Sequence, residues 1–425
     1  LEGDVLDFDA LRRNLRRVHA LMLEGKIRAA VAIDEGGIAA ELTKMALGNR
    51  LGFTFQKPFP HTESLFCLQP GGMLLEMDSA ADADQLLEGL DHLTLGTVTD
   101  RPEIVLNDTT WQLDELTDAW TKPLDKIFPA KAPVSETPAD LQDMPLYKAE
   151  TRHQAAVKAA RPKVFIPVFP GQNCEYDSAR AFEKAGADPH ILVVRKLTPA
   201  AIEETVEAMV KGIGDAQIIM LPGGFSAGDE PDGSGKFIAT MFRNPRIAEA
   251  VNTLLQQRDG LMLGICNGFQ ALIKLGLVPY GEIRPLSEDS PTLTFNTIGR
   301  HVSQMVRTRI VSNKSPWLSL VEPGDIHSIA VSHGEGRFYA PAETIRELFR
   351  NGQVATQYVD MDGKPTMESP YNPNGSLYAV EGITSPDGRI LGKMGHSERY
   401  LPGLMQNIYG EKDQHLFEAG VRYFK

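Results

Sequence analysis

Short apolar runs alternate with amphipathic stretches in the chain from residue 162 onward. The runs lack polar residues at every second position, which is typical of parallel strands that are covered on both faces. A first strand, a loop at Gly171 and a helix lie within residues 163–187, further strands are expected at residues 190–197, 217–221 and 261–265, and helices at residues 199–211, 236–241 and 247–257. This order predicts a doubly wound, mostly parallel α/β sheet of flavodoxin-like topology in residues 162–425.

The pattern changes to further strands after residue 277. These strands are expected at residues 293–296, 301–310, 328–332 and 353–360, and a helix at residues 413–423 is expected to cap the domain. We expect these strands to belong to the same domain, residues 162–425.

Residues 1–130 predict a smaller α+β domain. Helices are expected at residues 7–24, with Asp9 as N-cap, at residues 38–46, and at residues 111–130, with a break near Pro123. Strands are expected at residues 28–33, 65–68, 72–77, 92–98 and 103–106. Gly36 and Gly37, before the second helix, are expected either to form an ordinary turn or to have a function that needs further domains. Residues 131–161 hold several prolines among charges and are expected to be a linker.

Composition narrows the class of protein. The 425 residues carry a formal net charge of −13, which argues against a nucleic-acid surface and favours an enzyme of small molecules. The apolar runs are far shorter than the about 20 residues of a membrane span. Three cysteines without metal-like spacing fit a reducing cytoplasm better than a disulfide scaffold. Because the sequence begins at Leu1, we expect a piece of a longer chain.

The stretch LMLGICNGFQ at residues 261–270 carries the strongest chemical signal. A strand ends in a G-x-nucleophile-x-G turn with Cys266 at its centre, and a helix follows. The flanking glycines relieve the crowding of the tight turn. A thiol at the first turn of a helix is activated by the helix dipole, so we expect Cys266 to be a nucleophile. Cys174, in PGQNCEYD, lacks such a turn and is expected to be structural, with lining of the site as the alternative.

A base and an oxyanion site complete the candidate chemistry. His396 follows an apolar run, and Glu398, two residues later, can hold its ring in one tautomer. His333 with Glu335 has the same spacing and remains an alternative base. The glycine pair in PGGFSAGD at residues 222–229 can direct the N–H groups of Gly224 and Phe225 at an oxyanion, with the N–H of Asn267 as a further donor. Gln270, one turn after the nucleophile, either helps to hold the substrate or lies on the helix surface.

The stretches GICNGFQ, PGGFSAGD, SHGEG and GHSER together resemble the triad glutamine amidotransferase domain. The form most similar is the one fused to the C-terminus of large phosphoribosylformylglycinamidine (FGAM) synthases. The resemblance implies Cys266 as nucleophile, His396 as base and Glu398 as orienting carboxylate, and it places His333 and Gly334 at the glutamine pocket. Gly395 and Ser397 stand where the commoner M-P-H-P-E form has prolines.

The first domain is similar to the C-terminal domain of the aminoimidazole ribonucleotide (AIR) synthetase superfamily, so the resemblance covers essentially the whole chain. The His-Asp pair of active copies is replaced by Val31 and Ala32. The resemblance implies glutamine as substrate and no metal or cofactor in the amidotransferase domain. It implies N-terminal synthetase domains as partners and, in the complete enzyme, ATP, magnesium and formylglycinamide ribonucleotide (FGAR).

Two other functions remain open at this stage. A cysteine peptidase or deglycase of similar α/β fold also uses a cysteine elbow, but its histidine directly follows the cysteine, where this chain has Asn267. The other alternative is an interaction scaffold without catalysis, against which the presence of Cys266, His396 and Glu398 argues.

Overall fold

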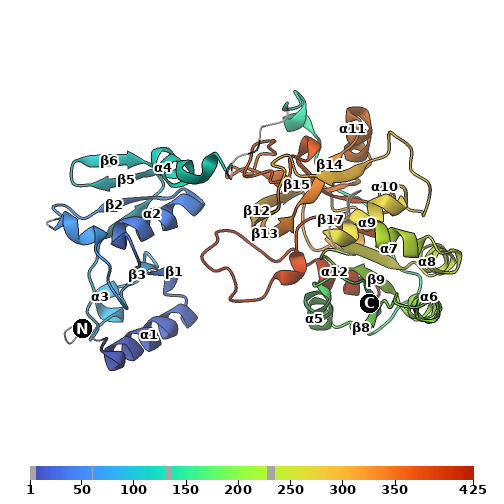
Figure 1. The fold of residues 1–425 in the computed structure, drawn as a ribbon, viewed down its shortest axis with the longest axis horizontal. Helices are drawn as coiled ribbons and strands as arrows, with labels where there is room; N and C mark the ends of the chain where they lie inside the picture. The colour runs from blue at the N-terminus through green and yellow to red at the C-terminus, as the bar shows by residue number, and fades with distance from the viewer. Residues whose placement is uncertain (1–5, 60, 128, 130–131, 133–135, 227–234) are drawn as a thin grey trace. The chain divides into compact units, whose positions relative to one another are not determined.

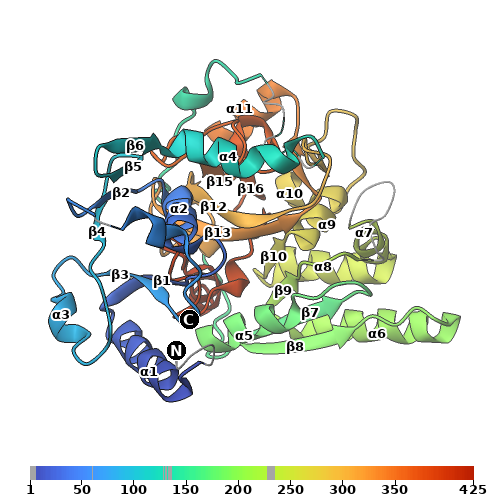
Figure 2. The same ribbon diagram turned by 60° about the vertical axis from the view of Figure 1, so that its left-hand side comes forward.

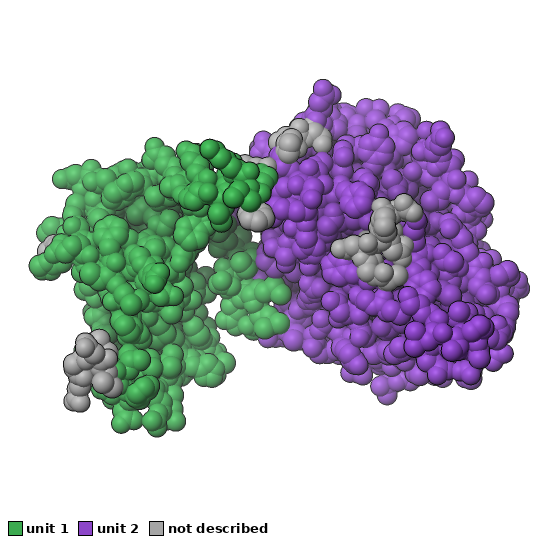
Figure 3. Space-filling model, viewed as in Figure 1, with its two compact units in different colours: residues 1–130, 403–409 green, residues 131–402, 410–425 purple. Residues whose placement is uncertain are grey.

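The computed structural model of the chain describes residues 6–59, 61–127, 129, 132, 136–226 and 235–425. The chain forms two compact units: unit 1 is residues 1–130 with 403–409, and unit 2 is residues 131–402 with 410–425 (Figure 3). Parts of three predicted segments lie outside the described residues: the end of the 111–130 helix, part of the 131–161 linker, and residues 227–229 of the PGGFSAGD loop.

Unit 2 is built on a nine-stranded sheet. Its strands are β7 (Lys163–Val168), β8 (Asp188–Val193), β9 (Ile218–Leu221), β10 (Leu261–Ile265), β12 (Val302–Ile310), β13 (Ile326–His333), β15 (Val354–Val359), β16 (Val380–Thr384) and β17 (Ile390–Lys393). They follow the order β13-β12-β15-β16-β17-β10-β9-β7-β8 (Figure 2). The half from β17 to β8 is parallel, and the other strands pair antiparallel.

Helices cover both faces of the parallel half. They are α5 (Glu175–Ala185), α6 (Pro199–Asp215), α7 (Lys236–Phe242), α8 (Pro245–Gln257), α9 (Asn267–Leu275) and α12 (Leu416–Arg422). Helix α5 packs with α12, while α6 packs with α8, on the other side of the strands (Figure 1). Strands β9 and β10 are buried over their whole length, which explains their unbroken apolar runs. The predicted doubly wound α/β fold is confirmed.

The order β8-β7-β9-β10 reverses direction between β7 and β9. Open α/β sheets bind ligands at such a switch point, outside the carboxyl ends of the strands. The loops that follow β7, β9, β10 and β17 all leave the sheet at this edge, because these strands are parallel. Cys174, the glycine pair, Cys266 and His396 come from these four loops.

Additional elements complete unit 2. A two-stranded sheet pairs β11 (Thr292–Phe295) with β14 (Glu335–Tyr339), and the helices α10 (Leu277–Tyr280) and α11 (Ala342–Arg350) lie outside the sheets. Helix α11 was not predicted, although its apolar residues recur at helical spacing.

Unit 1 is an α+β unit with small sheets. Its helices are α1 (Phe8–Leu23), α2 (Gly37–Asn49), α3 (Ala83–Leu86) and α4 (Leu113–Asp125), and its strands are β1 (Ile27–Ala32), β2 (Gly52–Phe55), β3 (Met73–Met77), β4 (Gly96–Thr99), β5 (Glu103–Leu106) and β6 (Thr109–Gln112). One sheet pairs β1 with β3, and the other has the order β4-β2-β5-β6. Across the described ranges, every helix is too short or too polar to cross a membrane.

Three details of the sequence-based prediction for unit 1 are wrong. Asp7, and not Asp9, caps α1, because its carboxylate accepts the N–H groups of Asp9 and Ala10 at 3.0 Å. The expected strand at residues 65–68 overlaps a 3-10 helix at Thr62–Phe66. The helix expected at residues 111–130 begins only at Leu113, because Trp111 and Gln112 pair with β5 as part of β6; it ends at Asp125, soon after Pro123.

Candidate active site

The predicted nucleophile elbow is present at the end of β10. Cys266 has φ 52° and ψ −106°, a backbone conformation that a non-glycine residue adopts only where the surrounding structure enforces it. The reason is close packing between α9 and its neighbours, because a Cβ on Gly268 would lie 2.0 Å from the Leu221 carbonyl oxygen. The backbone thus turns sharply at the thiol, as the G-x-nucleophile-x-G pattern requires.

His396 and Glu398 form a buried pair after β17. Nδ1 of His396 lies 2.6 Å from Oε1 of Glu398, and both side chains are at most 1% exposed. Burial alone would lower the pKa of His396, but the Glu398 carboxylate and the two nearby cysteines raise it well above its ordinary value. Burial would raise the pKa of Glu398, and His396 instead lowers it. The pair is therefore suited to hold an imidazolium.

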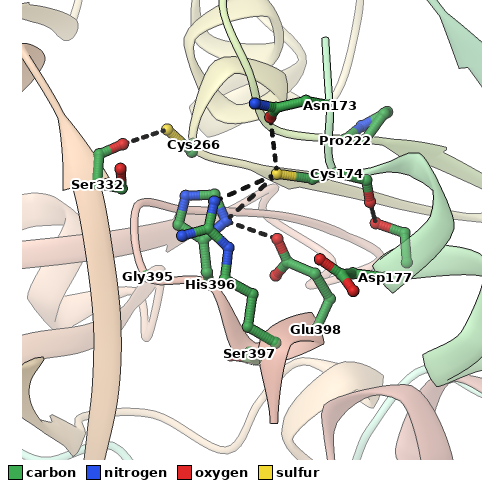
Figure 4. A network of polar contacts seen from close by, with 12 residues as sticks. Asn173, Cys174, Asp177, Pro222, Cys266, Ser332, Gly395, His396, Ser397 and Glu398 are labelled. Atoms are coloured by element: carbon green, nitrogen blue, oxygen red, sulfur yellow. Dashed lines mark hydrogen bonds and ion pairs between the residues drawn. The ribbon is translucent and has the colours of Figure 1, made fainter. Parts of the chain in front are cut away.

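Gly223 marks the point at which these groups meet. A Cβ placed on Gly223 would lie 2.7 Å from Cε1 of His396 and 3.5 Å from Cβ of Cys266. Figure 4 shows the His396 ring between Cys266 and Glu398. The structure thus brings together a thiol and an imidazole that are 130 positions apart in the sequence.

Cys174 is a second thiol in this site. Its Sγ is buried and lies 3.9 Å from Nδ1 of His396, and Nη2 of Arg399 donates to the same sulfur at 3.5 Å. This thiol therefore faces the ring nitrogen that Glu398 already holds. Nε2 of His396, in contrast, has no hydrogen-bond partner among the described residues. A base needs a free nitrogen toward its nucleophile, so the elbow geometry and the free Nε2 both favour Cys266 over Cys174.

One metal-like arrangement occurs in the described part of the chain. Ligand atoms of Cys174, His396 and Glu398 lie within 4.8 Å of one another. Sulfur, imidazole and carboxylate are ligands that zinc accepts. The guanidinium of Arg399 next to the sulfur opposes a second cation there, and the His396–Glu398 hydrogen bond already uses two of the three groups. The arrangement therefore fits a hydrogen-bonded triad better than a metal site.

The predicted oxyanion donors lie beside the elbow, but one of them is occupied. The N–H of Phe225 donates to the Gly171 carbonyl oxygen at 2.9 Å. Gly224 has φ 127°, and a Cβ there would lie 2.5 Å from Cα of Gln172, so this position requires glycine. Asn267 begins α9, where first-turn N–H groups lack partners within the helix. The N–H groups of Gly224 and Asn267 are therefore the better candidates.

Asn267 and Gln270 connect the loops around the site. The Asn267 side chain donates to Oε1 of Gln270 at 2.9 Å and accepts the N–H of Ser226 at 3.3 Å. Nε2 of Gln270 donates to the Glu335 carbonyl oxygen at 2.5 Å. Gln270 is buried, so the alternative of a surface glutamine is wrong. Its amide holds the elbow helix against β14.

His333 lies near the site without a carboxylate on its ring. Nδ1 of His333 pairs with Oδ1 of Asn296 at 3.2 Å, and Nε2 has no partner among the residues described. Burial, together with repulsion from His396 and His301, lowers the pKa of His333 to about 3. The structure therefore does not support His333 as the base. Gly334 accepts the N–H of Asn296 at 3.0 Å and borders the same loop.

A cavity of about 410 Å³ borders Ser397 and Glu398 from the side of α5 and α12. Lys184, Arg422 and other residues of these helices line it, and Cys266 does not. This cavity therefore does not give access to the thiol.

Sequence reasoning gave no role to several residues of the site. Gly223 was quoted only as part of a glycine pair, Cys174 was expected to be structural, and Arg399 and Asn296 were not considered. A usable signal exists for Cys174, because PGQNCEYD follows β7, and loops after parallel strands of a doubly wound sheet meet at one edge.

Comparisons with known proteins found a family model and several similar proteins. Residues 161–424 match the CobB/CobQ-like glutamine amidotransferase domain. The chain is 36% identical over 279 residues to a phosphoribosylformylglycinamidine synthase subunit PurQ of Methanococcus maripaludis, covering 62% of this chain and 95% of that protein. It is 33% identical over 283 residues to the PurQ subunit of Treponema denticola, covering 62% and 99%. A solved structure of PurLQS from Thermotoga maritima contains a chain that is 26% identical, with 62% and 100% covered and a TM-score of 0.46.

Proposed function

The chain belongs to the family of CobB/CobQ-like glutamine amidotransferase domains, and we propose that it releases ammonia from the side-chain amide of glutamine through a thioester on Cys266. The observation that carries this proposal is the meeting of Cys266, His396 and the backbone of Gly223 at one edge of the sheet. A thiol, a histidine oriented by a carboxylate and nearby N–H donors are the parts that acyl transfer through a cysteine needs.

The reaction proceeds in two acyl-transfer steps. The Cys266 thiolate attacks the amide carbon, and the N–H groups of Gly224 and Asn267 stabilise the oxyanion. Nε2 of the His396 imidazolium gives its proton to the leaving nitrogen, the C–N bond breaks, and ammonia departs from the thioester. The neutral imidazole then takes a proton from water, the hydroxide attacks the thioester, and glutamate leaves as Cys266 is regenerated. Glu398 keeps Nδ1 bonded, so that Nε2 carries the proton in both steps.

A Cys266→Ser variant tests this function. We expect it to remain folded, because serine has nearly the same shape, and to lose glutamate release by at least about a thousandfold. A Cys67→Ser variant is the matched control, since Cys67 is an exposed free thiol in unit 1. Its activity should equal that of the unchanged protein. Glutamine turnover that survives in folded Cys266→Ser would refute the assignment of the nucleophile.

We further propose that this domain supplies ammonia to an ATP-dependent FGAM synthase. The names of the PurQ relatives support this reaction, and PurLQS suggests synthetase subunits or domains as partners. The corresponding acceptor is FGAR, and ATP with magnesium would bind to the synthetase part. The free state of all three cysteines supports a reducing compartment such as the cytoplasm.

Unit 1 is proposed to belong to that synthetase part, as a domain related to the C-terminal domain of the AIR synthetase superfamily. The order of β1, the glycine turn at Gly36 and Gly37, and α2 supports this relation. The large-type arrangement, in which the synthetase precedes the amidotransferase in one chain, follows from it. The test is to add a separately prepared synthetase polypeptide with FGAR and ATP. Glutamate release should rise, and ammonia should appear in product instead of in solution. No change in turnover would argue against this partner.

The alternative of a cysteine peptidase or deglycase gains no support. The position after the nucleophile is Asn267, and its buried amide is bonded to Gln270 and Ser226. A scaffold without catalysis is equally unsupported, because the buried His396–Glu398 pair sits at the elbow thiol.

A further inference from the structure

A buried ion pair lies next to the turn that carries His396. Lys393, at the end of β17, and Glu381, on the neighbouring β16, place Nζ and Oε1 3.4 Å apart, and the two side chains are 1% and 0% exposed. Removing two charges from water is costly, so such a pair persists only with additional hydrogen bonds to its free donors and acceptors. The bonds that satisfy this pair go mainly to the residues on either side of His396.

The pair holds both neighbours of the histidine. Nζ of Lys393 donates to the Gly395 carbonyl oxygen at 2.8 Å and to Oγ of Ser397 at 3.0 Å. The N–H of Gly395 donates to Oε1 of Glu381 at 2.5 Å. Both backbone groups of Gly395 and the hydroxyl of Ser397 are therefore fixed by one ion pair. The backbone N–H of His396 is fixed separately, by the Ala330 carbonyl oxygen at 2.8 Å.

We call the Lys393–Glu381 ion pair, with its hydrogen bonds to Gly395 and Ser397, the clamp. Further contacts hold the side chains of the clamp in place. Oγ1 of Thr356 donates to Oε2 of Glu381, and Oγ of Ser397 donates to Oε1 of Gln414 at 2.7 Å. The Lys393 ammonium thus donates hydrogen bonds to Gly395 and Ser397 and has Glu381 as its ion-pair partner.

Gly395 is the residue that makes room for this pair. A Cβ on Gly395 would lie 2.7 Å from Cγ2 of Ile329 and 3.0 Å from both Oε1 of Glu381 and Nζ of Lys393. A proline at this position would also lose the N–H that Glu381 accepts. The Gly-His-Ser turn and the ion pair thus depend on one another.

We propose that Lys393 and Glu381 are positioning residues for His396, and that their ion pair and hydrogen bonds keep the turn of Gly395, His396 and Ser397 rigid. The inference rests on the proposed function, in which His396 is the base. The side chains of Lys393 and Glu381 bond to the residues beside His396, while only the backbone carbonyl oxygen of Lys393 bonds to Cys266, by accepting its N–H at 2.8 Å. Their effect acts through the direction of the imidazole, since a base that is displaced even slightly transfers a proton poorly.

Lys393→Met and Ser397→Ala test the clamp at two strengths. Lys393→Met removes the ion pair with Glu381 and the hydrogen bonds to Gly395 and Ser397. It should lower kcat about a hundredfold and leave KM within about twofold, because a misplaced base slows chemistry without weakening glutamine binding. Ser397→Ala removes the bond from Lys393 and the bond to Gln414, leaves the other contacts of Lys393 in place, and should lower kcat about fivefold. Ser385→Ala is the matched control, since Ser385 is also buried and donates to a carboxylate, Asp387, at 2.7 Å in the turn before β17. It should retain the unchanged kcat.

A rescue variant separates rigidity from charge. Ser397 is the first residue of a 3-10 turn, Ser397–Arg399, where the fixed φ of proline fits, although proline gives up the N–H that Ser397 donates to the Gly395 carbonyl oxygen at 3.2 Å. In the Lys393→Met background, Ser397→Pro should recover about tenfold of the lost kcat, because it fixes the backbone without the ammonium. If the double variant is folded and no faster than Lys393→Met, the rigidity argument is wrong.

A measurement without turnover keeps the test independent of the proposed function. Alkylation of Cys266 by iodoacetamide, followed against pH in a Cys67→Ser, Cys174→Ser background, reports the pairing of the thiol with His396. The profile should shift in Lys393→Met and Ser397→Ala and stay unchanged in Ser385→Ala. An unchanged profile and kcat in folded Lys393→Met would overturn the clamp, and Ser397→Ala decides in the same way if Lys393→Met does not fold. Absence of glutaminase activity in the unchanged protein would instead overturn the proposed function, while the alkylation profile still tests the clamp.

Discussion

Cys174 approaches His396 on the ring nitrogen that is already bonded, with Sγ 3.9 Å from Nδ1. The same nitrogen lies 2.6 Å from Oε1 of Glu398, and the opposite nitrogen has no partner in the described part of the chain. Both thiols raise the pKa of the histidine, but only Cys266 sits on a strained elbow. A short distance between a cysteine and His396 therefore does not identify the nucleophile. The ring nitrogen that the cysteine approaches does identify it.

A Cys174→Ser variant should keep most of the glutaminase activity. Its kcat should fall by no more than about tenfold, because the thiol contacts the base without reacting. The measurement is glutamate release, with mass spectrometry to locate the cysteine that iodoacetamide labels at neutral pH. Glutamine should protect Cys266 from the label. Loss of activity in folded Cys174→Ser, together with labelling of Cys174, would exchange the roles of the two residues.

A Gly223→Ala variant should lose activity without unfolding. The new Cβ would lie 2.7 Å from Cε1 of His396 and 3.3 Å from Sγ of Cys174, so the imidazole must move. Because small displacements of catalytic groups cost about a hundredfold in rate, we expect a decrease in kcat of that order. The melting temperature and kcat of the variant are measured together.

Gly214→Ala is the control for this substitution. Gly214 lies in α6, and no atom lies within 4 Å of an added Cβ. Alanine in a helix is favoured over glycine by roughly 0.5–1 kcal/mol, so this variant should be slightly more stable and fully active. Equal kcat values for the two variants would show that Gly223 does not limit the position of the base.

The parallel half of unit 2 was predictable because each of its elements has a local signal. The central strands β9 and β10 are unbroken apolar runs, most of the helices are amphipathic, and Gly268 of the elbow meets a steric limit at Leu221. The pairing of His396 with Glu398 also follows from local spacing, since the two residues share one short turn.

Features that depend on distant contacts were not predictable from one sequence. The sequence predicts the N–H of Phe225 as an oxyanion donor, but in the structure this N–H donates to the Gly171 carbonyl oxygen in the loop after β7. Gln270 lies one turn after the nucleophile, and only the approach of β14 shows that its amide is buried. The strand expected at residues 65–68 is apolar enough for a strand, but a 3-10 turn at Thr62–Phe66 satisfies its backbone instead.

A Gln270→Met variant should lower stability more than it changes KM. It leaves the Asn267 amide and the Glu335 carbonyl oxygen without their buried partner, and each unsatisfied buried group costs about 1–3 kcal/mol. The free energy of unfolding in urea measures this loss, and Gln256→Met, at an exposed position of α8, serves as control. A large rise in KM at unchanged stability would assign Gln270 to substrate binding instead.

The low pKa of His333 predicts a specific dependence of stability on pH. In the folded protein this pKa is about 3, compared with 6.5 ordinarily, because the ring is buried near other histidines. Below pH 6.5 the unfolded chain therefore binds a proton at this residue that the folded chain does not bind. The free energy of unfolding decreases as the pH is lowered, and this decrease levels off below about pH 3. From pH 7 to pH 5 the contribution of one such group is about 2 kcal/mol.

Denaturant unfolding of His333→Gln at pH 7 and pH 5 measures this contribution directly. Glutamine can still donate to Oδ1 of Asn296, the present partner of Nδ1, so the variant should fold. Its stability should fall by about 2 kcal/mol less than that of the unchanged protein over this interval, because the group that takes up the proton on unfolding is gone. His190→Gln, at an exposed position of β8, should leave the pH dependence as it was. If the stability of His333→Gln depends on pH as steeply as that of the unchanged protein, residue 333 must accept a proton in the folded protein above pH 5. The imidazole of His333 would then be charged next to His396, which contradicts a buried neutral ring.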